Sequence, residues 1–280
     1  MPLSQREQPL FVLCMARSGS TLLRYSLDTH PQICAPPEMH IAATMFYLQS
    51  TYQSTLRFPE HSDSQQQQHF LRQRTKQSID QILDDVYALK GDAHATDTLW
   101  CEKSIHTVKY IDTVLAVYPA ARFLILHRDC LDQVTSALDT LSIDPSGNAY
   151  DFASYLAATE HPMLGLVEHW IAKTDMLLRG EQFLGDRCLR LRYEDLINQP
   201  RAILERTFSF LGVAQDDSLV DRIFTTPHRD GAGDHKIRTA RSISRDSITK
   251  AHSLDLSLLS TSQHERISSL QRELGYDPLC

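Results

Sequence analysis

The feature that most constrains this sequence is a stretch near its beginning, residues 10–24, which reads Leu-Phe-Val-Leu-Cys-Met-Ala-Arg-Ser-Gly-Ser-Thr-Leu-Leu-Arg. The apolar run from Leu10 to Cys14 is typical of a buried strand, and the leucines that follow at helical spacing predict a helix ending near Asp28. Such a strand-to-helix turn favours anion binding, because the first N–H groups of a helix lack partners within it and the helix dipole is positive there.

The turn itself adds groups suited to a phosphate-like anion. Gly19 allows the backbone to come close to a ligand, Arg17 carries a permanent positive charge, and neighbouring residues offer hydroxyl donors. The expected anion-binding residues are Arg17, Ser18, Gly19, Ser20, Thr21 and Leu22. The turn is not a Walker A loop, because Cys14 stands where the first glycine is required and Ser20 where the lysine is required. An ordinary strand-to-helix turn is the alternative at this point.

Composition limits the classes of protein to consider. With 280 residues and 42% hydrophobic content, the chain can bury a full core, and we expect one domain. The net charge of −7 argues against a nucleic-acid partner, so an anionic cofactor would need a local cluster of Arg and Lys. No run approaches the ~18 apolar residues of a membrane span, and the beginning lacks a signal-peptide pattern. We therefore expect no membrane association and a cytoplasmic location.

The six cysteines, at positions 14, 34, 101, 130, 188 and 280, show no paired spacing. Most lie in or beside apolar runs, where cysteine behaves as a small buried hydrophobic residue. We expect them to be reduced, and no Cys/His spacing suggests a zinc site.

Four further apolar runs predict strands, and helical patterns separate them. The strand-like runs are residues 32–35, 98–103, 123–126 and 187–192, and the main helical patterns cover residues 70–89, 107–118, 130–141, 151–180 and 200–211. This alternation predicts an α/β domain with a central parallel sheet of four to five strands and helices on both faces. Residues 41–97 include a polar stretch and carry no motif, and we expect a helical insertion on the acceptor side of the ligand crevice.

A second candidate anion site follows the strand at residues 123–126. Arg128 lies just after the strand, Asp129 can cap the next helix, and Ser136 lies two turns into that helix. The His-Arg-Asp wording also occurs in the protein-kinase catalytic loop, but Val134 replaces the asparagine that loop requires and no Gly-x-Gly-x-x-Gly loop precedes it. A surface charge is the alternative for Arg128.

Three ionisable residues near strand ends are candidates for catalysis. Glu38 follows two prolines after the second strand, where it could accept a proton from a substrate; the alternative is a charge that favours a helix N-terminus. Lys103 and His106 come at the end of the third strand. For His106 the alternative is a helix-start or core residue.

The loop at residues 17–23 resembles the 5′-phosphosulfate loop of the sulfotransferases that use 3′-phosphoadenosine 5′-phosphosulfate (PAPS), in the protein-tyrosine and bacterial branches that have arginine there. The spacing of Arg128 and Ser136 is similar to the family's 3′-phosphate motif. Tyr193-Glu-Asp resembles its adenosine-contacting segment, although a packed tyrosine is the alternative, and the Gly-rich stretch around Lys236 resembles its C-terminal loop. The resemblance implies these cofactor-binding residues: Arg17, Ser18, Gly19, Ser20, Thr21, Leu22, Arg128, Ser136, Tyr193 and Lys236.

The same resemblance implies catalytic roles for Arg17, Glu38, Lys103 and His106. Glu38 follows Arg17 at the distance that matches the general base of the protein-tyrosine enzymes, whereas His106 lies one residue later than the base of the cytosolic enzymes. Which of the two is the base stays open. The Ala-Pro-Pro-Glu wording that ends at Glu38 is similar to sulfotransferase domains of bacterial polyketide synthases.

The resemblance implies that residues 1–280 form one P-loop-like sulfotransferase domain, with residues 41–97 as the insertion. Such an enzyme would move the sulfuryl group of PAPS to a hydroxyl of a small molecule or secondary metabolite, or of an acyl chain on a carrier protein. A metal ion is less necessary than in phosphoryl transfer, because the sulfuryl group carries less negative charge. The alternatives are a P-loop kinase-like phosphotransferase and a non-catalytic nucleotide-binding module. The sequence does not name the acceptor or the oligomeric state.

Overall fold

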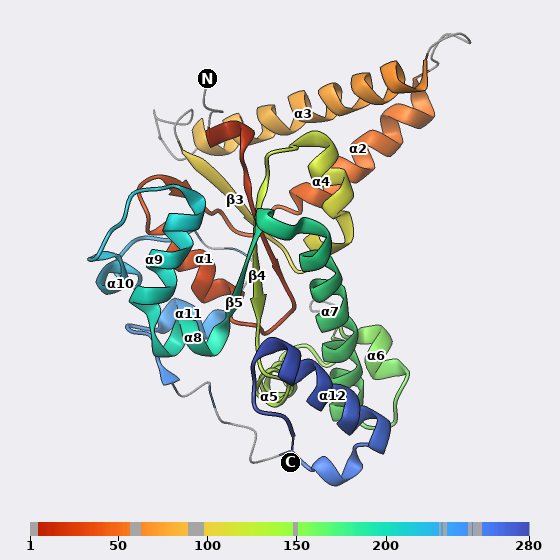
Figure 1. The fold of residues 1–280 in the computed structure, drawn as a ribbon, viewed down its shortest axis with the longest axis vertical. Coiled ribbons are helices and arrows are strands. Elements are labelled where there is room, and N and C mark those ends of the chain that lie inside the picture. Colours follow the sequence, from red (N-terminus) through yellow and green to blue (C-terminus); the bar gives the residue numbers. More distant parts are fainter. Residues whose placement is uncertain are drawn as a thin grey trace.

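The computed structural model describes residues 5–56, 63–88, 98–147, 151–229, 231, 234–245, 248 and 254–279. A five-stranded parallel sheet in the order β2-β3-β1-β4-β5 forms its centre (Figure 1). The strands are β1 (Leu10–Cys14), β2 (Ile33–Cys34), β3 (Leu99–Lys103), β4 (Arg122–His127) and β5 (Cys188–Arg192). The predicted α/β fold with a parallel sheet is confirmed.

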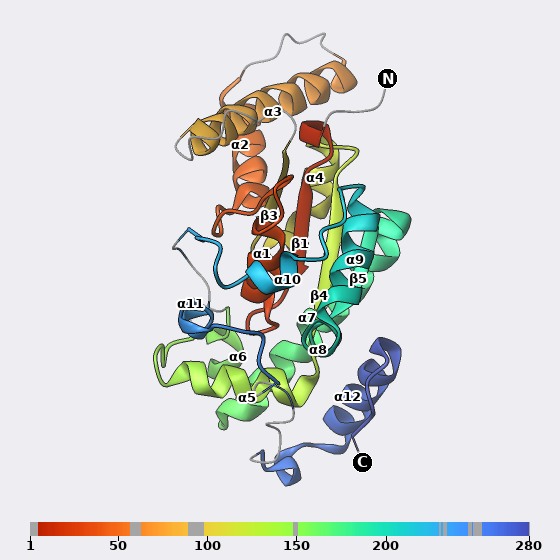
Figure 2. The ribbon, with the colours of Figure 1, turned by 90° about the vertical axis from the view of Figure 1, so that its left-hand side faces the viewer.

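Both faces of the sheet are covered, because alternate residues of the apolar strands point to opposite sides. Leu10, Val12 and Cys14 belong to one buried cluster, and Phe11 and Leu13 belong to another. The first cluster is covered by α1 (Ser20–Asp28), α8 (Tyr193–Asn198), α9 (Pro200–Leu211) and α10 (Leu219–Arg222). The second is covered by α2 (Ile41–Thr55), α3 (Ser64–Ala88), α4 (Ile111–Val117), α5 (Cys130–Leu141), α6 (Ala153–Ala157), α7 (Pro162–Leu184) and α12 (Thr261–Leu274). Figures 1 and 2 show these layers from two directions.

The strand register brings the predicted site residues to one edge of the sheet. Val12 pairs with Lys103, Cys14 pairs with Leu126, and the last residues of β4 and β5 pair with each other. Because the strands are parallel, the segments that follow them all leave at the same edge. β1 and β4 are neighbours, yet α1 and α5, which follow them, pack on opposite faces. Two connections that diverge in this way create the crevice in which open α/β sheets bind ligands.

Several predicted boundaries need correction. Glu38 does not lie in a first helical turn, because α2 begins only at Ile41 and His40, with φ 55°, precedes it. The expected helix at 151–180 is two helices, α6 and α7, since Pro162 can begin a helix but cannot continue one. The expected helix at 107–118 begins as a 3₁₀ turn, η2 (Thr107–Tyr110), before α4. In contrast, α5 has the predicted bounds, and the Asp129 carboxylate caps it by accepting from the Leu131 N–H at 2.9 Å.

The expected insertion is helical where the structure describes it. The pair α2 and α3 extends away from the sheet (Figure 1), and α3 packs beside η1 (Gln5–Glu7), the short turn that precedes β1. Arg6 contacts Asp84 at 2.7 Å, and the hydroxyl of Tyr118 donates to Asp80 at 2.8 Å. These contacts lie at the edge of the sheet where β1 begins, whereas Glu38 follows the end of β2. Within α2 and α3, only the beginning of α2 therefore lies near Glu38. The acceptor-side role of residues 41–97 stays a prediction.

The remaining described elements are short: η4 (Gly185–Arg187), α11 (His235–Thr239) and η7 (Leu256–Leu258). The cysteines at 14, 34, 101, 130 and 188 are free thiols, and Cys280 lies outside the described residues. Among the described helices, none combines the length and the hydropathy that crossing a membrane requires.

One buried side chain makes stability depend on pH. His169 of α7 is completely buried. Its ring packs edge to face against the rings of Phe152 and Tyr155, with ring centres 4.8 and 5.2 Å apart. Among the described residues, neither of its ring nitrogens has a hydrogen-bond partner. Burial, together with the nearby positive charge of Lys173, lowers the pKa of His169 to about 3. The folded protein therefore keeps this imidazole neutral.

We predict that His169 weakens the fold in mildly acidic solution. Below the ordinary histidine pKa of about 6.5, the unfolded chain binds a proton that the folded chain does not. This effect lowers the free energy of unfolding by up to about 1.4 kcal/mol per pH unit as the pH falls from 6.5. In urea unfolding at pH 7 and pH 5, His169→Met should lose less stability than the wild type, and the matched change at exposed His69 should alter nothing. An equal loss in wild type and His169→Met would contradict the prediction.

Candidate functional site

The loop between β1 and α1 is held by hydrogen bonds to its own carbonyl groups. Arg128 donates to the carbonyl of Arg17 at 2.8 Å, Gln133 donates to the carbonyl of Ala16 at 2.8 Å, and the Ser18 hydroxyl donates to Met15 at 2.8 Å. Arg17 has a φ of 63°, a left-handed conformation that costs free energy in a residue other than glycine. The bonds from surrounding side chains offset that cost and fix the loop.

Gly19 is required by close packing against Tyr193, the first residue of α8. Its φ is 84°, and a Cβ atom at this position would lie 2.1 Å from Cδ2 of the Tyr193 ring. Gly19 is also the residue before α1, so no side chain caps the first N–H groups of that helix. The Tyr193 ring also contacts Arg128, whose guanidinium lies over the ring at 4.5 Å from its centre.

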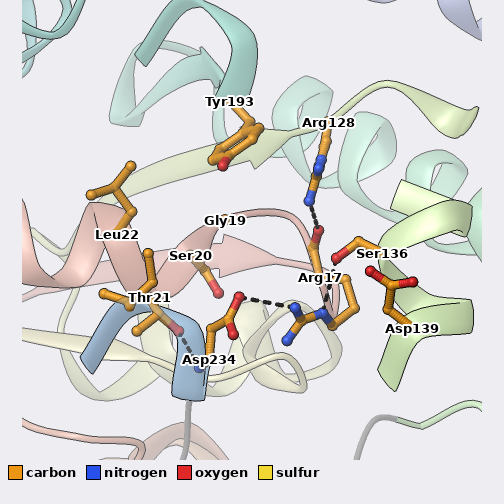
Figure 3. A pocket seen from close by; sticks show the side chains of 11 residues that line it. Arg17, Gly19, Ser20, Thr21, Leu22, Arg128, Ser136, Asp139, Tyr193 and Asp234 are labelled. Carbon is orange, nitrogen blue, oxygen red and sulfur yellow. Dashed lines mark hydrogen bonds and ion pairs between the residues drawn. The ribbon is translucent and has the colours of Figure 1, made fainter. Parts of the chain in front are cut away.

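These residues surround a pocket at the carboxyl ends of β1, β4 and β5 (Figure 3). Its cavity volume is about 90 Å³, and the cavity opens to solvent. The residues that line it are Arg17, Gly19, Ser20, Thr21, Leu22, Arg128, Ser136, Asp139, Tyr193, Asp234 and Ile237. Most of the predicted cofactor-binding residues are therefore brought together. Ser18 does not line the pocket, because its side chain is fully buried and its hydroxyl donates to the carbonyl of Met15.

Arg17 is turned toward Ser136 and Asp234 (Figure 3). Its Nε donates to the Ser136 hydroxyl at 3.2 Å, and its Nη2 contacts Asp234 Oδ2 at 2.9 Å. The backbone N–H of Asp234 donates to the Thr21 hydroxyl at 3.0 Å. A C-terminal segment is thus attached to both sides of the loop, and its carboxylate lies where an anion would meet Arg17.

The sequence prediction missed Asp234 and Asp139. Asp234 belongs to the same Gly-Asp-x-Lys motif from which we selected Lys236. The motif therefore marked this segment, but the binding role was assigned to the lysine. Lys236 lies on α11, and its side chain falls outside the described part of the structure. The pocket lining therefore contains two described cations, Arg17 and Arg128, and two carboxylates.

Arg128 is positioned by residues from three elements. It is buried, and the indole N–H of Trp170 on α7 donates to its carbonyl at 3.0 Å. The next residue, Asp129, donates its N–H to Glu194 at 3.0 Å, and Tyr276 donates to the other oxygen of Glu194 at 2.8 Å. Trp170 belongs to no motif, and Glu194 belongs to the Tyr193-Glu-Asp segment but was given no role, so only the packed structure reveals this positioning.

Glu38 and Lys103 form a buried ion pair beside this pocket. Their side chains are only 10% and 2% exposed. Burial raises the pKa of the Cys14 thiol to about 11, and the charges of Lys103 and Glu38 act on that thiol in opposite directions. The pair therefore lies near the end of β1, where the anion-binding loop begins. Two charges removed from water are stable only when they satisfy each other, so removal of one partner should be costly.

A second carboxylate lies beside the pair. Glu102 is fully buried and accepts the N–H of Ile41, the first residue of α2, at 2.6 Å. Burial raises the pKa of Glu102 to about 7, and the negative charge of Glu38 contributes to the rise. Glu102 thus holds the segment that carries Glu38. It was not predicted, because its position in a strand gave no sign that it would meet a helix N-terminus.

His106 lies outside the pocket lining, on a more open surface. Its Nδ1 is 3.8 Å from Oδ2 of Asp151, and its side chain is 36% exposed. Burial lowers the pKa of His106, although the negative charge of Asp151 opposes the shift. Between His106 and the ion pair, His40 is hydrogen-bonded to the Ser104 hydroxyl at 3.0 Å. The assignment of the base to Glu38 or His106 stays a prediction.

Within the described ranges, no group of three or more His, Cys, Asp or Glu side chains is placed to hold a metal ion.

Comparison with known proteins places this site in a family. A profile of the "Sulfotransferase family" matches residues 9–217. A protein-tyrosine sulfotransferase of Drosophila melanogaster is 25% identical over 217 residues, which are 77% of this chain and 40% of that protein. Protein-tyrosine sulfotransferase A of Caenorhabditis elegans is 22% identical over 278 residues, which are 96% of this chain and 67% of that protein. The chain thus spans less than half of the Drosophila protein.

Two solved structures share the fold along nearly the whole chain. The sulfotransferase domain of the Synechococcus PCC 7002 olefin synthase has a TM-score of 0.67 at 24% identity and covers 96% of this chain and 95% of its own. The sulfotransferase domain from the curacin biosynthetic pathway has a TM-score of 0.68 at 20% identity, with coverages of 97% and 99%. At these identities the likeness establishes the fold. Since the family profile matches well over half of the chain, the protein belongs to the sulfotransferase family.

Proposed function

We propose that this protein is an enzyme that moves the sulfuryl group of PAPS to a hydroxyl of a small molecule or of an acyl chain on a carrier protein. The observation that carries the proposal is the meeting of Arg17 and Arg128, from the loops after β1 and β4, in one pocket. A cytoplasmic location and an acceptor from secondary metabolism remain predictions of the sequence.

The donor groups of the pocket fit PAPS. Arg128 and Ser136 would hold the 3′-phosphate, and Ser20 and Thr21 at the beginning of α1 would hold the 5′ side. Tyr193 would contact the adenosine. When bound, PAPS supplies an activated sulfuryl group. Asp234 holds Nη2 of Arg17, so a cofactor oxygen that binds the same nitrogen must compete with that carboxylate.

The ion pair beside the pocket supports catalysis. Glu38 would accept the proton of the acceptor hydroxyl, and the ammonium group of Lys103 contacts that carboxylate. Lys103 and Arg17 would stabilise negative charge that develops on oxygen. A non-catalytic nucleotide-binding module would not need this buried pair, and Ser20 at the Walker lysine position argues against a kinase-like phosphotransferase.

The direct test is a screen with radiolabelled PAPS over alcohols, phenols, amines and carrier-bound β-hydroxyacyl groups. Label transferred to a hydroxyl acceptor supports the proposal. Tight binding of the product 3′-phosphoadenosine 5′-phosphate (PAP) with no transfer to any acceptor would favour the non-catalytic module. Preference for ATP with magnesium over PAP would favour the phosphotransferase.

We expect Arg128→Ala to weaken PAP binding by ~2–4 kcal/mol, the range for removing one partner of a buried charged hydrogen bond. Adenosine 5′-phosphosulfate, which lacks the 3′-phosphate, should lose far less, and this difference separates the loss of phosphate contact from any loosening of the loop. Calorimetry with both ligands measures it. Equal losses would show that Arg128 acts through the loop and not on the 3′-phosphate.

Asp234→Asn should bind PAP more tightly than the wild type. The Asp234 side chain is 25% exposed, and a partly exposed ion pair of this kind contributes up to about 1 kcal/mol, so the gain should be at most about five-fold. The matched control is Asp221→Asn, which removes a carboxylate paired with Arg201 away from the pocket. Weaker binding by Asp234→Asn would instead mean that this carboxylate helps to hold the cofactor.

Glu38→Gln should keep its affinity for PAP and lower turnover by ~10²–10⁴-fold, the range for loss of a general base. His106→Ala should cost less, because His106 lies outside the pocket lining. Glu38→Gln leaves the Lys103 ammonium buried without its partner, so thermal unfolding should be measured for the same variants. A nearly normal rate for Glu38→Gln together with an inactive, folded His106→Ala would reverse the assignment of the base.

A further inference from the structure

Two segments of the chain run outward side by side from the Glu38–Lys103 pair. One is residues 38–47, which lead into α2, and the other is residues 103–110, which end in η2. Beyond the ion pair, His40 is hydrogen-bonded to Ser104 at 3.0 Å, and the His40 and His106 rings lie 6.3 Å apart between centres. Farther out, Phe46 faces Tyr110 with ring centres 5.4 Å apart. The two segments therefore form one continuous surface that begins at the predicted catalytic carboxylate.

The outer end of this surface is a group of aromatic rings, Phe46, Tyr47 and Tyr110, here called the aromatic cluster. The Phe46 and Tyr47 rings lie 5.5 Å apart, edge to face. Phe46 is 45% exposed and Tyr47 is 61% exposed. Large aromatic side chains that gather on a surface instead of entering the core indicate a contact site, because burying them would lower the free energy of the protein.

Charges beside the aromatic cluster favour a negatively charged partner. Lys109 precedes Tyr110, is 40% exposed, and lies 3.6 Å from Asp151. The same carboxylate is paired with Lys173, whose side chain is nearly buried. Two ammonium groups thus share one carboxylate. An acidic group on a ligand would complete the pairing of Lys109.

The length of the surface sets the size of that ligand. Phe46 is five residues after Ile41 on α2, which corresponds to about 7.5 Å of helix, and Glu38 lies a further three residues back. A molecule whose hydroxyl meets Glu38 must therefore extend on the order of 10 Å to reach the aromatic cluster. A short alcohol or a single phenol ring would leave the cluster uncovered.

We propose that the acceptor is an elongated hydroxyl compound that places an apolar ring or chain on the aromatic cluster, with an acidic group near Lys109. This inference rests on the proposed function in one respect, the placement of the reacting hydroxyl at Glu38. The aromatic cluster contributes affinity through ring contacts and burial of apolar surface. It is a specificity site and takes no part in the chemistry.

The test is calorimetry on the PAP-loaded protein with a long and a short hydroxyl ligand that share the same end groups. The long ligand is 4′-hydroxybiphenyl-4-carboxylate and the short one is 4-hydroxybenzoate. The wild type should bind the long ligand at least ten-fold more tightly. Phe46→Ala should weaken the long ligand about 3- to 10-fold, the range of one aromatic contact, and leave the short ligand and PAP unchanged. The matched control is Phe183→Ala, which removes another exposed ring, on α7; Phe183 is 61% exposed and Phe46 is 45% exposed.

Equal binding of the two ligands by the wild type would overturn the inference, and so would the same response from Phe46→Ala and Phe183→Ala. Both variants change exposed residues, and their unfolding curves serve as the check on folding. Failure of PAP to bind would count against the proposed function alone. In that event the same two ligands, titrated without PAP, still decide whether the aromatic cluster binds the long one.

Discussion

The site depends on the hydrogen bonds that Arg128, just after β4, and Gln133, on α5, donate to the loop after β1. Arg128 and Gln133 bind the carbonyls of Arg17 and Ala16, and so stabilise a left-handed residue that would otherwise raise the free energy of the loop. This is possible because β1 and β4 pair along their length, from Leu10 opposite Arg122 to Cys14 opposite Leu126. The pairing brings the end of β1 beside the connection that follows β4. Arg128, which is expected to bind the 3′-phosphate of the cofactor, thus also shapes the loop that is expected to bind the 5′ side.

Two of the positive charges at the site are already neutralised by carboxylates of the protein itself. Arg17 is paired with Asp234, and Lys103 is paired with Glu38. An anionic ligand therefore gains only the difference between its own contacts and those that it replaces. The arrangement disfavours weak or singly charged anions, and it favours a ligand that offers several anionic oxygens at once. It also links cofactor binding to the C-terminal segment, because Asp234 is attached to Thr21 as well as to Arg17.

The sequence predicted the elements that depend on local patterns. The strand-to-helix turn at residues 10–24 and the cap at Asp129 were recognised because the residues that form them are neighbours in the chain. The break at Pro162 was equally local and was overlooked because the apolar pattern continues across it. The contacts of Asp234 and Trp170 could not be predicted, since each joins residues far apart in sequence whose meeting depends on strand order and helix packing.

The strand order also explains how two ligands can meet at one loop. Most of the pocket residues follow β1, β4 and β5. Glu38 follows β2 and Lys103 ends β3, and these two strands lie on the other side of β1. In the proposed function, the loop after the central strand would separate a cofactor half from an acceptor half of the same sheet edge. In the proposed transfer, the sulfuryl group would cross at this loop, where helix α1 begins and its N-cap residue, Gly19, offers no side-chain cap. The first N–H groups of α1 would stabilise negative charge there without the cost of reorganising water.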